Sequence, residues 1–457
     1  MAVISPLAAI RYPQSQQSAL VAPPYDVLTE KDKAHLLARN GHNVVAIDLP
    51  HLPPSQAGPD AAYAAAAHTL ATWLEAGILM RDTKPALYAY QQTYTYAGVT
   101  YHRRGMFTRV RLEEFSTGQA AAGGGGTGGI HPHEQTFSGP KEDRLKLMRA
   151  TKANLSPVFG LYDDPENDVT DLLFEAVGST PALATAELPS MDGLSAVRSE
   201  IWAVTDHAVI QDITLMMADK DLYIADGHHR YTTCLNYRKE LSEQRGVPLE
   251  HNDPANFALF VLIAMQDPGL IIMPTHRVVA AVGMESFYLE RFVELAKKTC
   301  KIMETKLNGD SLAKLEKELP SFGPHAMGVY DPIGDQVIVI VPRDADPLAA
   351  FSDDPALAGK SASWRALDVA ILQHLVFDRI VAPGFLAAGA KMSWAYPHEA
   401  HEVGKLCRGG QYRVGFILQP TPLTAVRDLC NAGELMPQKS TFFYPKLATG
   451  LVINPLT

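Results

Sequence analysis

The sequence has few cysteines, with only four in 457 residues. Cys234, Cys300, Cys407 and Cys430 are scattered and form no C-x-x-C pair. This spacing favours neither a disulfide framework nor a thiolate zinc site. We therefore expect four buried free thiols.

Long hydrophobic runs are also lacking. Continuous apolar stretches such as 257–265 and 269–273 are well below the roughly 20 residues that a membrane-spanning helix needs. The first residues, Met-Ala-Val-Ile-Ser-Pro, contain none of the basic side chains that begin a secretory signal. The sequence predicts a cytoplasmic protein with no membrane partner.

An excess of positive charge is the third absence. The formal net charge is −10 at pH 7, which argues against a general nucleic-acid or anionic-membrane surface. A local basic pocket inside an acidic shell stays open. At 457 residues and 47% hydrophobic, the chain can bury a sizeable core and is long enough for two or three domains of about 150 residues.

The patterns along the chain predict an α+β fold with mixed or antiparallel sheets and flanking helices. Apolar periodicity and capping signals predict helices at 29–40, 61–76, 140–153, 169–177 and 366–379. Strands are predicted at 44–48, 155–162, 201–204, 222–225 and 414–418, and hairpins at 87–112, 257–273 and 329–341. The Gly/Ala-rich stretch 116–129 is expected to be a flexible surface loop.

Three regions follow from this organisation. Residues 1–115 form an N-terminal α+β region, residues 116–280 a region that carries the polar motifs HPHE and DGHHR, and residues 281–457 a C-terminal α+β region. No internal repeat occurs at a fixed period.

The most informative stretch is a short apolar run that ends at Asp226-Gly227 and continues as His228, His229 and Arg230. It predicts a strand, a tight turn and a helix whose first turn carries three cationic or ligand-type side chains. Unpaired backbone N–H groups and the positive end of the helix dipole favour an anion there, so a phosphate is the first ligand to consider. The alternative is a plain turn with surface histidines.

A second polar cluster, His131-Pro-His133-Glu134, precedes a basic helix that contains Lys141 and Arg144. The spacing of the histidines is a weak zinc signal, so the presence of a metal stays open. Glu134 is a candidate general base, because a carboxylate in a partly desolvated pocket is tuned toward neutral pH. Alternatively, it caps a helix.

Two further clusters lie nearer the C-terminus. His276 and Arg277 directly follow a predicted strand, and Lys439 precedes two hydroxyl residues, so all three are candidate phosphate ligands. For the cluster that contains Lys439, a strand edge with solvated lysines is the alternative. Residues 22–26, Ala-Pro-Pro-Tyr-Asp, suit either a site or a structural corner, and the residues alone do not separate the two.

Six motifs in order along the chain carry a family resemblance. They are Ala22-Pro-Pro-Tyr-Asp-Val27, Pro132-His-Glu134 with Ser138-Gly-Pro-Lys141, Asn154-Leu-Ser-Pro157, Ala225-Asp-Gly-His-His-Arg-Tyr231, Pro274-Thr-His-Arg277 and Met436-Pro-Gln-Lys-Ser-Thr441. Together they resemble a bacterial domain-of-unknown-function family, numbered one-zero-one-five, over nearly the whole chain. The Gly-rich stretch before His131 is longer than the usual connection in that family.

A more distant resemblance supplies chemistry. The strand, Asp-Gly-His-His-Arg turn and helix resemble the phosphate-binding turn of the ParB and sulfiredoxin superfamily, which includes nucleotide-dependent free-serine kinases. The resemblance implies that nucleotide phosphates bind through the His and Arg side chains and the helix N-terminus. Serine or phosphoserine as the other substrate follows from this association alone.

These observations predict an enzyme that moves phosphate between a nucleotide, ATP or ADP, and a small hydroxylated metabolite, with Mg²⁺ as a candidate cofactor. The expected catalytic residues are Glu134, Asp226, His228 and His229, and the expected phosphate-binding residues are Arg230, Lys141, Arg144, His133, His276, Arg277 and Lys439. Residues 131–144 and 226–230 are then expected to line one pocket.

Two alternatives stay open at this point. A phosphatase would use the same cluster with water as acceptor and His228 as phospho-accepting nucleophile. A ParB-like regulator would bind nucleotide without turnover. In each case the partners are small molecules and not nucleic acid, and the oligomeric state is open.

Overall fold

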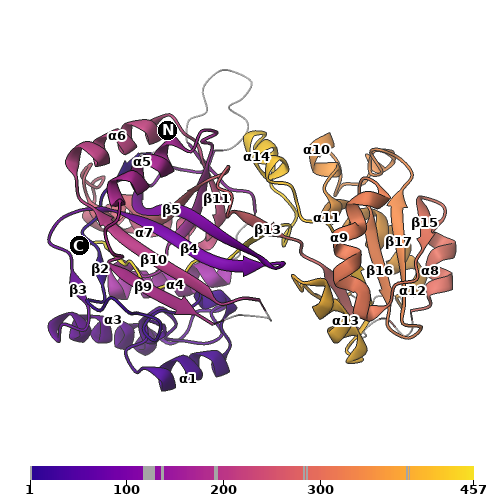
Figure 1. The fold of residues 1–457 in the computed structure, drawn as a ribbon, viewed down its shortest axis with the longest axis horizontal. Coiled ribbons are helices and arrows are strands. Elements are labelled where there is room, and N and C mark those ends of the chain that lie inside the picture. The colour runs from indigo at the N-terminus through magenta and orange to yellow at the C-terminus, as the bar shows by residue number, and fades with distance from the viewer. Residues whose placement is uncertain are drawn as a thin grey trace. The chain divides into compact units, whose positions relative to one another are not determined.

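The computed structural model describes residues 3–116, 129–134, 138–189, 194–280, 284, 287–387, 390 and 392–457. It divides into two compact units, of which the first is Met1–Ile271 with Pro445–Thr457 and the second is Ile272–Tyr444 (Figure 1). Most of the predicted loop 116–129 lies outside the described residues.

The first unit is built on one mixed sheet. Among the described residues its nine strands follow the order β6-β11-β8-β12-β5-β4-β10-β9, with β1 paired to β5. The strands are β1 (Ile4–Ser5), β4 (Leu87–Tyr96), β5 (Val99–Arg111), β6 (Ile130–His131), β8 (Val158–Tyr162), β9 (Ala184–Leu188), β10 (Val197–Val204), β11 (Leu222–Asp226) and β12 (Phe257–Ala264). The pairs β6–β11 and β8–β12 are parallel, and the other pairs are antiparallel.

Helices cover this sheet and extend the unit. They are α1 (Glu30–Arg39), α2 (Val45–Asp48), α3 (Asp60–Glu75), α4 (Ser138–Thr151), α5 (Asp168–Val177), α6 (His207–Ala218) and α7 (His228–Arg245), with short η1 (Tyr25–Val27) and η3 (Pro254–Asn256). In Figure 1, α5 and α6 lie above the strands and α1 and α3 below them. Short strands β2 (Ile10–Arg11) and β3 (Met80–Arg81) pair, as do β7 (Ala153–Asn154) and β21 (Asn454–Pro455).

Helix α4 lies between two apolar cores. Its Leu145 and Met148 pack with the sheet and with α5, α6 and α7. Its Leu147 packs with α1, α2 and α3. Because apolar contacts hold the helix on two sides, its polar residues have fixed neighbours.

The second unit has an antiparallel sheet of six strands within the described residues, in the order β15-β17-β16-β19-β14-β18. These strands are β14 (Arg277–Ala280), β15 (Cys300–Glu304), β16 (Met327–Asp331), β17 (Gln336–Pro342), β18 (Trp394–Ala395) and β19 (Tyr412–Ile417), and β13 (Ile271–Met273) pairs separately with β20 (Phe442–Tyr444). The helices are α8 (Leu289–Ala296), η4 (Gly309–Ser311), α9 (Leu312–Phe322), η5 (Ala349–Phe351), α10 (Ala362–Arg365), α11 (Asp368–Ile371), the π-helix η6 (Leu372–Val381), α12 (Ala382–Phe385), α13 (Ala400–Arg408) and α14 (Leu423–Asn431).

Local signals predicted many elements correctly, and the α+β fold with mixed and antiparallel sheets is confirmed. Thr29 caps α1 and exchanges hydrogen bonds with Asp32, as a capping box requires. The β4–β5 hairpin turns at Ala97 and Gly98, both at positive φ. All four cysteines are free and buried.

The predicted strand at 44–48 is wrong, because most of this segment forms helix α2. Its β-branched residues favour a strand by propensity. However, the buried Asn43 side chain accepts a hydrogen bond from Val45 N and donates to the carbonyl oxygens of Ala19 and Val21. These contacts start a helical turn, and tertiary packing overrides the propensity.

The predicted hairpin at 257–273 is also wrong. The turn between its strands exists, since Leu270 N donates to Asp267 O at 3.0 Å. Strand β12, however, pairs with β5 on one edge and β8 on the other, so β13 has no edge to join. The units also differ from the three predicted regions, because β4 and β5 of the first region share a sheet with strands of the second.

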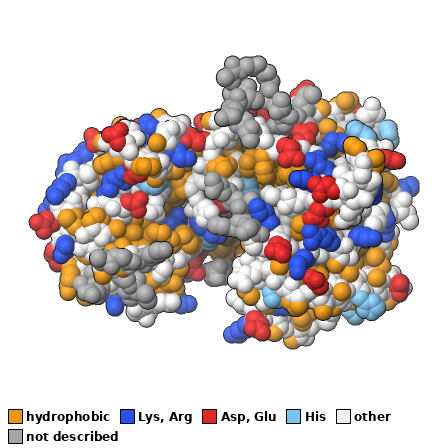
Figure 2. All heavy atoms as spheres, turned by 180° about the vertical axis from the view of Figure 1, so that it is seen from behind, with side chains coloured by type: hydrophobic (Ala, Val, Ile, Leu, Met, Phe, Trp, Pro, Cys, Tyr) orange, Lys and Arg blue, Asp and Glu red, His pale blue; other side chains and the backbone are white. Residues whose placement is uncertain are grey.

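The surface carries charges of both signs. On the face in Figure 2, Lys and Arg side chains are interspersed with Asp and Glu. No helix among the described residues has the length and apolar character needed to cross a membrane.

Candidate functional site

The predicted strand, turn and helix are confirmed: β11 ends at Asp226 and α7 begins at His228. Gly227 joins them with φ +94°, and a Cβ there would lie 2.9 Å from Nε of Arg230. No side chain in the described part of the chain caps α7. The N-terminus of this long helix can therefore bind an anion through its backbone N–H groups.

Arg230 is buried and bound to protein oxygens. Its Nη2 donates to Asp226 Oδ2 at 2.9 Å, and its Nη1 donates to Pro157 O. Only 7% of the residue is exposed. One terminal nitrogen of Arg230 therefore holds the carboxylate at the end of β11, and the other binds a carbonyl oxygen of a separate segment. The predicted grip of Arg230 on phosphate stays a prediction.

A second cation reaches the same carboxylate from the C-terminal segment of the unit. Nζ of Lys446 lies 3.7 Å from Asp226 Oδ1. Burial opposes the ionisation of Asp226, but Lys446 and Arg230 outweigh burial and hold the pKa of this carboxyl well below its usual range. Asp226 is thus an anion between two cations.

His228 and His133 are in direct contact, which brings the first two sequence clusters together. The backbone N–H of His133 donates to Nε2 of His228 at 3.2 Å, and the ring centroids are 4.7 Å apart. Burial, reinforced by the neighbouring His133, lowers the pKa of His228 well below its usual value. His228 is therefore a neutral acceptor at pH 7, with its proton on Nδ1.

His133 faces Glu134 with its other nitrogen. Its Nδ1 lies 2.7 Å from Ile224 O, so this nitrogen donates and the neutral ring carries its lone pair on Nε2. Nε2 lies 3.9 Å from Glu134 Oε1. The imidazole and the carboxylate therefore lie side by side. About a quarter of the Glu134 side chain, 24%, is exposed, so solutes reach it.

Arg144 belongs to a group of buried charged residues, with Asp48, Asp143 and Arg230, which we call the buried layer. Its Nε and Nη2 donate to Asp143 Oδ2 at 2.8 and 2.6 Å, and its Nη1 donates to Asp48 O at 2.6 Å. Its guanidinium also lies 4.0 Å from the centre of the Tyr25 ring. A carboxylate, a carbonyl oxygen and an aromatic ring therefore enclose the guanidinium. The predicted contact of Arg144 with phosphate stays a prediction.

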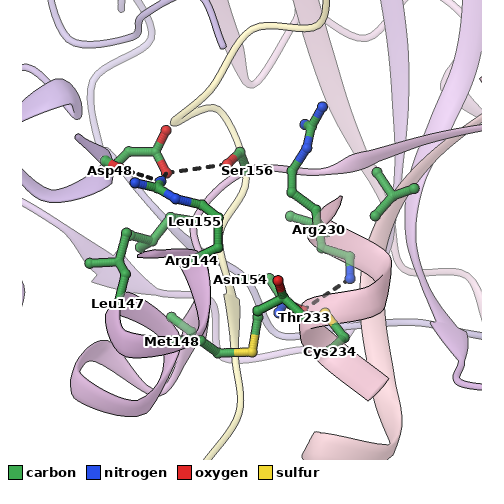
Figure 3. Close-up of a pocket in the computed structure, with 13 residues that line it drawn as sticks. Asp48, Arg144, Leu147, Met148, Asn154, Leu155, Ser156, Arg230, Thr233 and Cys234 are labelled. Atoms are coloured by element: carbon green, nitrogen blue, oxygen red, sulfur yellow. Dashed lines mark hydrogen bonds and ion pairs between the residues drawn. The ribbon is translucent and has the colours of Figure 1, made fainter. Parts of the chain in front are cut away.

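Arg144 and Arg230 line one internal cavity of about 40 Å³. Figure 3 shows Asp48, Arg144 and Ser156 toward one end and Met148 and Cys234 toward the other. Burial raises the pKa of Asp48, although the nearby arginines partly offset this effect. The volume accepts water molecules only, since small-molecule sites are usually above about 300 Å³. Of the residues expected to line one pocket, Arg144 and Arg230 line this cavity, and His133 contacts His228 outside it.

Partly exposed side chains surround the buried layer. His229, at the second position of α7, has its pKa lowered by burial; the charge of Asp26 opposes this shift, and the charge of Lys141 adds to it. The charges of Lys141 and Asp26 thus act on His229 at the start of α7. These groups form the accessible part of the site.

Sequence reasoning missed several of these residues. Asp26 and Tyr25 lie in the motif 22–27, which could have identified them, although the residues alone left a structural corner equally open. Asp48 follows an apolar run and gave a weak signal. Lys446, like Lys439, suits phosphate as a point charge by its sequence alone, and its contact with Asp226 joins distant segments of the chain.

His131 points to a separate set of partners. Its ring stacks on Tyr223, with centroids 5.0 Å apart, and its Nε2 lies 3.5 Å from Asp221 Oδ1. Within the described ranges, no set of three or more His, Cys, Asp or Glu side chains is arranged to hold a metal ion. Residues 135–137, which follow this cluster, lie outside the described residues.

The remaining candidates, His276, Arg277 and Lys439, belong to the second unit. Arg277 Nη2 donates to Lys439 O at 2.9 Å and Nη1 donates to Thr275 O at 2.5 Å. His276 is fully buried, and its Nδ1 accepts from Leu418 N at 3.1 Å. The structure brings the third and fourth clusters together, with backbone carbonyls around the guanidinium.

No curated protein matches the chain. A solved structure of a free serine kinase in complex with AMP is 13% identical, with a TM-score of 0.30 over 70% of this chain and 88% of that one. A variant of that kinase in complex with ADP is 11% identical, with a TM-score of 0.31 over 70% and 89% of the two chains. SbnI from Staphylococcus aureus, with a C-terminal truncation, is 12% identical, with a TM-score of 0.30 over 72% and 84%.

Structural similarity with these TM-scores and identities does not indicate an activity for this chain. The family comparison is stronger, because its model covers residues 4–370 of this chain. The predicted family is thereby confirmed, and the chain belongs to the family described as "Protein of unknown function (DUF1015)".

Proposed function

We propose that the protein transfers a phosphoryl group between a nucleotide and a small hydroxylated metabolite such as serine. One observation carries this proposal. The uncapped N-terminus of α7 lies beside the His133–Glu134 pair, because His133 donates to His228 in the first turn of that helix. An anion site and a candidate base are therefore adjacent, and phosphoryl transfer needs mainly positioning and charge neutralisation.

The phosphate would bind at the outer layer of the site. Backbone N–H groups of the first turn of α7 point at such a ligand, and His229 and Lys141 add side-chain donors. Arg230 and Arg144 act indirectly in this proposal. Their bonds to Asp226, Asp143 and Asp48 hold the turn and helix α4 in place.

The acceptor hydroxyl would lie between His133 Nε2 and Glu134 Oε1, which are 3.9 Å apart. Glu134 accepts a hydrogen bond from that hydroxyl. As the hydroxyl oxygen attacks the phosphorus atom, its proton passes to Glu134, and the bond to the leaving nucleotide oxygen breaks. His133 is held for this role by its bond to Ile224 O.

A divalent cation fits this site only together with the nucleotide. Mg²⁺ commonly uses one or two carboxylates plus substrate phosphates and waters. Asp226 and Asp48 already neutralise arginines, which leaves the exposed Asp26 as the carboxylate that would contact nucleotide-bound Mg²⁺. The ion would neutralise phosphate charge during transfer.

The phosphatase alternative is less well supported. A phospho-accepting His228 would need a free nitrogen, yet its Nε2 already accepts from His133 N and the residue is 7% exposed. The ParB-like regulator uses the same anion site but has no need of the His133–Glu134 pair.

The test is an assay by phosphorus NMR with ATP or ADP, Mg²⁺ and serine. Formation of a phosphorylated product, together with loss of a nucleotide phosphate, would support transfer. Release of inorganic phosphate from phosphoserine without nucleotide would instead identify a phosphatase. Nucleotide binding without either reaction would identify a regulator.

A further inference from the structure

The second unit contains a cavity of about 410 Å³ whose polar centre is a histidine–aspartate pair. Nδ1 of His325 lies 2.7 Å from Asp368 Oδ1, and each side chain is 19% exposed. Both residues line the cavity, together with Ser363, Thr424 and Asp428. Its volume lies in the range of small-molecule sites.

The backbone at His325 has the left-handed conformation. Ala326 N donates to Gly323 O at 3.4 Å, which closes a turn with Pro324 and His325 at its centre. His325 has φ +58°, a conformation that turns of this kind usually assign to Gly or Asn. This turn places the imidazole at the cavity.

The pair fixes the proton of the imidazole. Because Nδ1 donates to Asp368, the neutral ring has its lone pair on Nε2. Among the described residues, Nε2 has no protein partner. His325 therefore presents an acceptor to the cavity.

The charges of the lining favour a cation. Asp368 and Asp428 are acidic, and no Lys or Arg lies among the described residues that line the cavity. Arg427, next along the chain, pairs with Asp428 at 3.3 Å. An anion would face two carboxylates, although the start of α14 offers backbone donors to it.

A metal ion does not explain the site, because no group of three or more ligand-type side chains is found in the described ranges. We propose that this cavity binds a small organic ammonium ligand, which donates a hydrogen bond to Nε2 of His325 and is neutralised by Asp368 and Asp428. The inference goes beyond the proposed phosphoryl transfer and does not depend on it.

The experiment follows His325 directly in the full-length chain. Histidine is labelled with ¹³C, and the ring signal of His325 is assigned by its loss in His325→Asn. Ethanolamine is the probe, and acetate is its anionic counterpart. Ethanolamine should shift the His325 signal in a saturable way, because its ammonium group donates a hydrogen bond to Nε2 of the ring.

The variant separates binding from structure. Asn tolerates the left-handed backbone, so His325→Asn should keep the melting temperature of the wild type. Its affinity for ethanolamine, followed on the remaining signals or by calorimetry, should fall about tenfold or more. Unchanged affinity would overturn the proposal, as would a His325 signal that responds to acetate alone or to neither probe.

Discussion

The backbone N–H of His133 donates to Nε2 of His228 at 3.2 Å. This bond joins the loop before α4 to the first turn of α7. It makes His228 an acceptor and places the next residue, Glu134, beside the N-terminus of α7. The candidate base and the candidate phosphate site are thus positioned by one contact.

Replacing Glu134 tests the base. Glu134→Gln keeps the shape of the side chain but removes its basicity, so turnover should fall by about 10² to 10⁴ with nucleotide binding retained. Single-turnover phosphoryl transfer measures the effect. Glu142→Gln, an exposed position on α4, is the control and should leave the rate unchanged. Equal rates for wild type and Glu134→Gln would exclude Glu134 as the base.

Lys141 tests the phosphate contact. Lys141→Ala should weaken ADP binding by about tenfold, because a charge-assisted hydrogen bond is lost, while thermal stability is retained. Calorimetric titration with ADP measures this effect. Lys239→Ala, on the exposed side of α7 with a side chain 76% exposed, is the matched control. Loss of affinity in both variants would point to a general charge effect instead.

Gly227 is expected to be intolerant of a side chain. Gly227→Ala must adopt φ +94° and displace Arg230, whose Nε would lie 2.9 Å from the new Cβ. We expect a loss of about 2 to 4 kcal/mol in the free energy of unfolding. Gly246→Ala, at φ +69° with open space around it, should lose only about 1 kcal/mol. Denaturant unfolding compares the two, and equal losses would contradict a clash with Arg230.

The ionised Asp226 should make the stability of the protein depend on pH in the acid range. The fold holds the pKa of Asp226 well below its usual value. The stability that the ionised carboxylate adds is therefore complete above the unfolded pKa of about 3.9, and it declines as the pH falls toward the folded pKa. Asp226→Asn should therefore be about 1 to 3 kcal/mol less stable than wild type near neutral pH. The difference should shrink below about pH 4. Denaturant unfolding as a function of pH measures it, and a constant difference down to acid pH would contradict the assignment.

His228 predicts a second pH effect in a different range. Because its folded pKa is lowered, the unfolded chain binds a proton below about pH 6.5 that the folded chain does not. Stability should therefore fall as pH decreases through this range, by about 1.4 kcal/mol per pH unit relative to His228→Gln. Gln retains an acceptor for His133 N. Parallel pH profiles for the two proteins would show that His228 titrates normally.

Several parts of the structure could be predicted because their causes are local. The turn at Asp226-Gly227 and the start of α7 follow from an apolar run, a glycine and a helical pattern within a few residues. The capping box at Thr29 is a contact between residues three positions apart. Such features depend on backbone geometry and neighbouring side chains, which the sequence contains.

Tertiary structure decided which groups the charged side chains bind. Arg230 and Arg144 were predicted to bind phosphate, because a sequence shows a guanidinium but not its partners. Pro157 O and Asp48 come from other segments and occupy them. Lys446, far along the chain, completes the environment of Asp226. The sequence thus determined the family, the free state of the cysteines and the strand–turn–helix at the site. The partners of the two arginines depended on long-range packing. A buried guanidinium must pair with an acceptor, and the fold decides which acceptor lies near it.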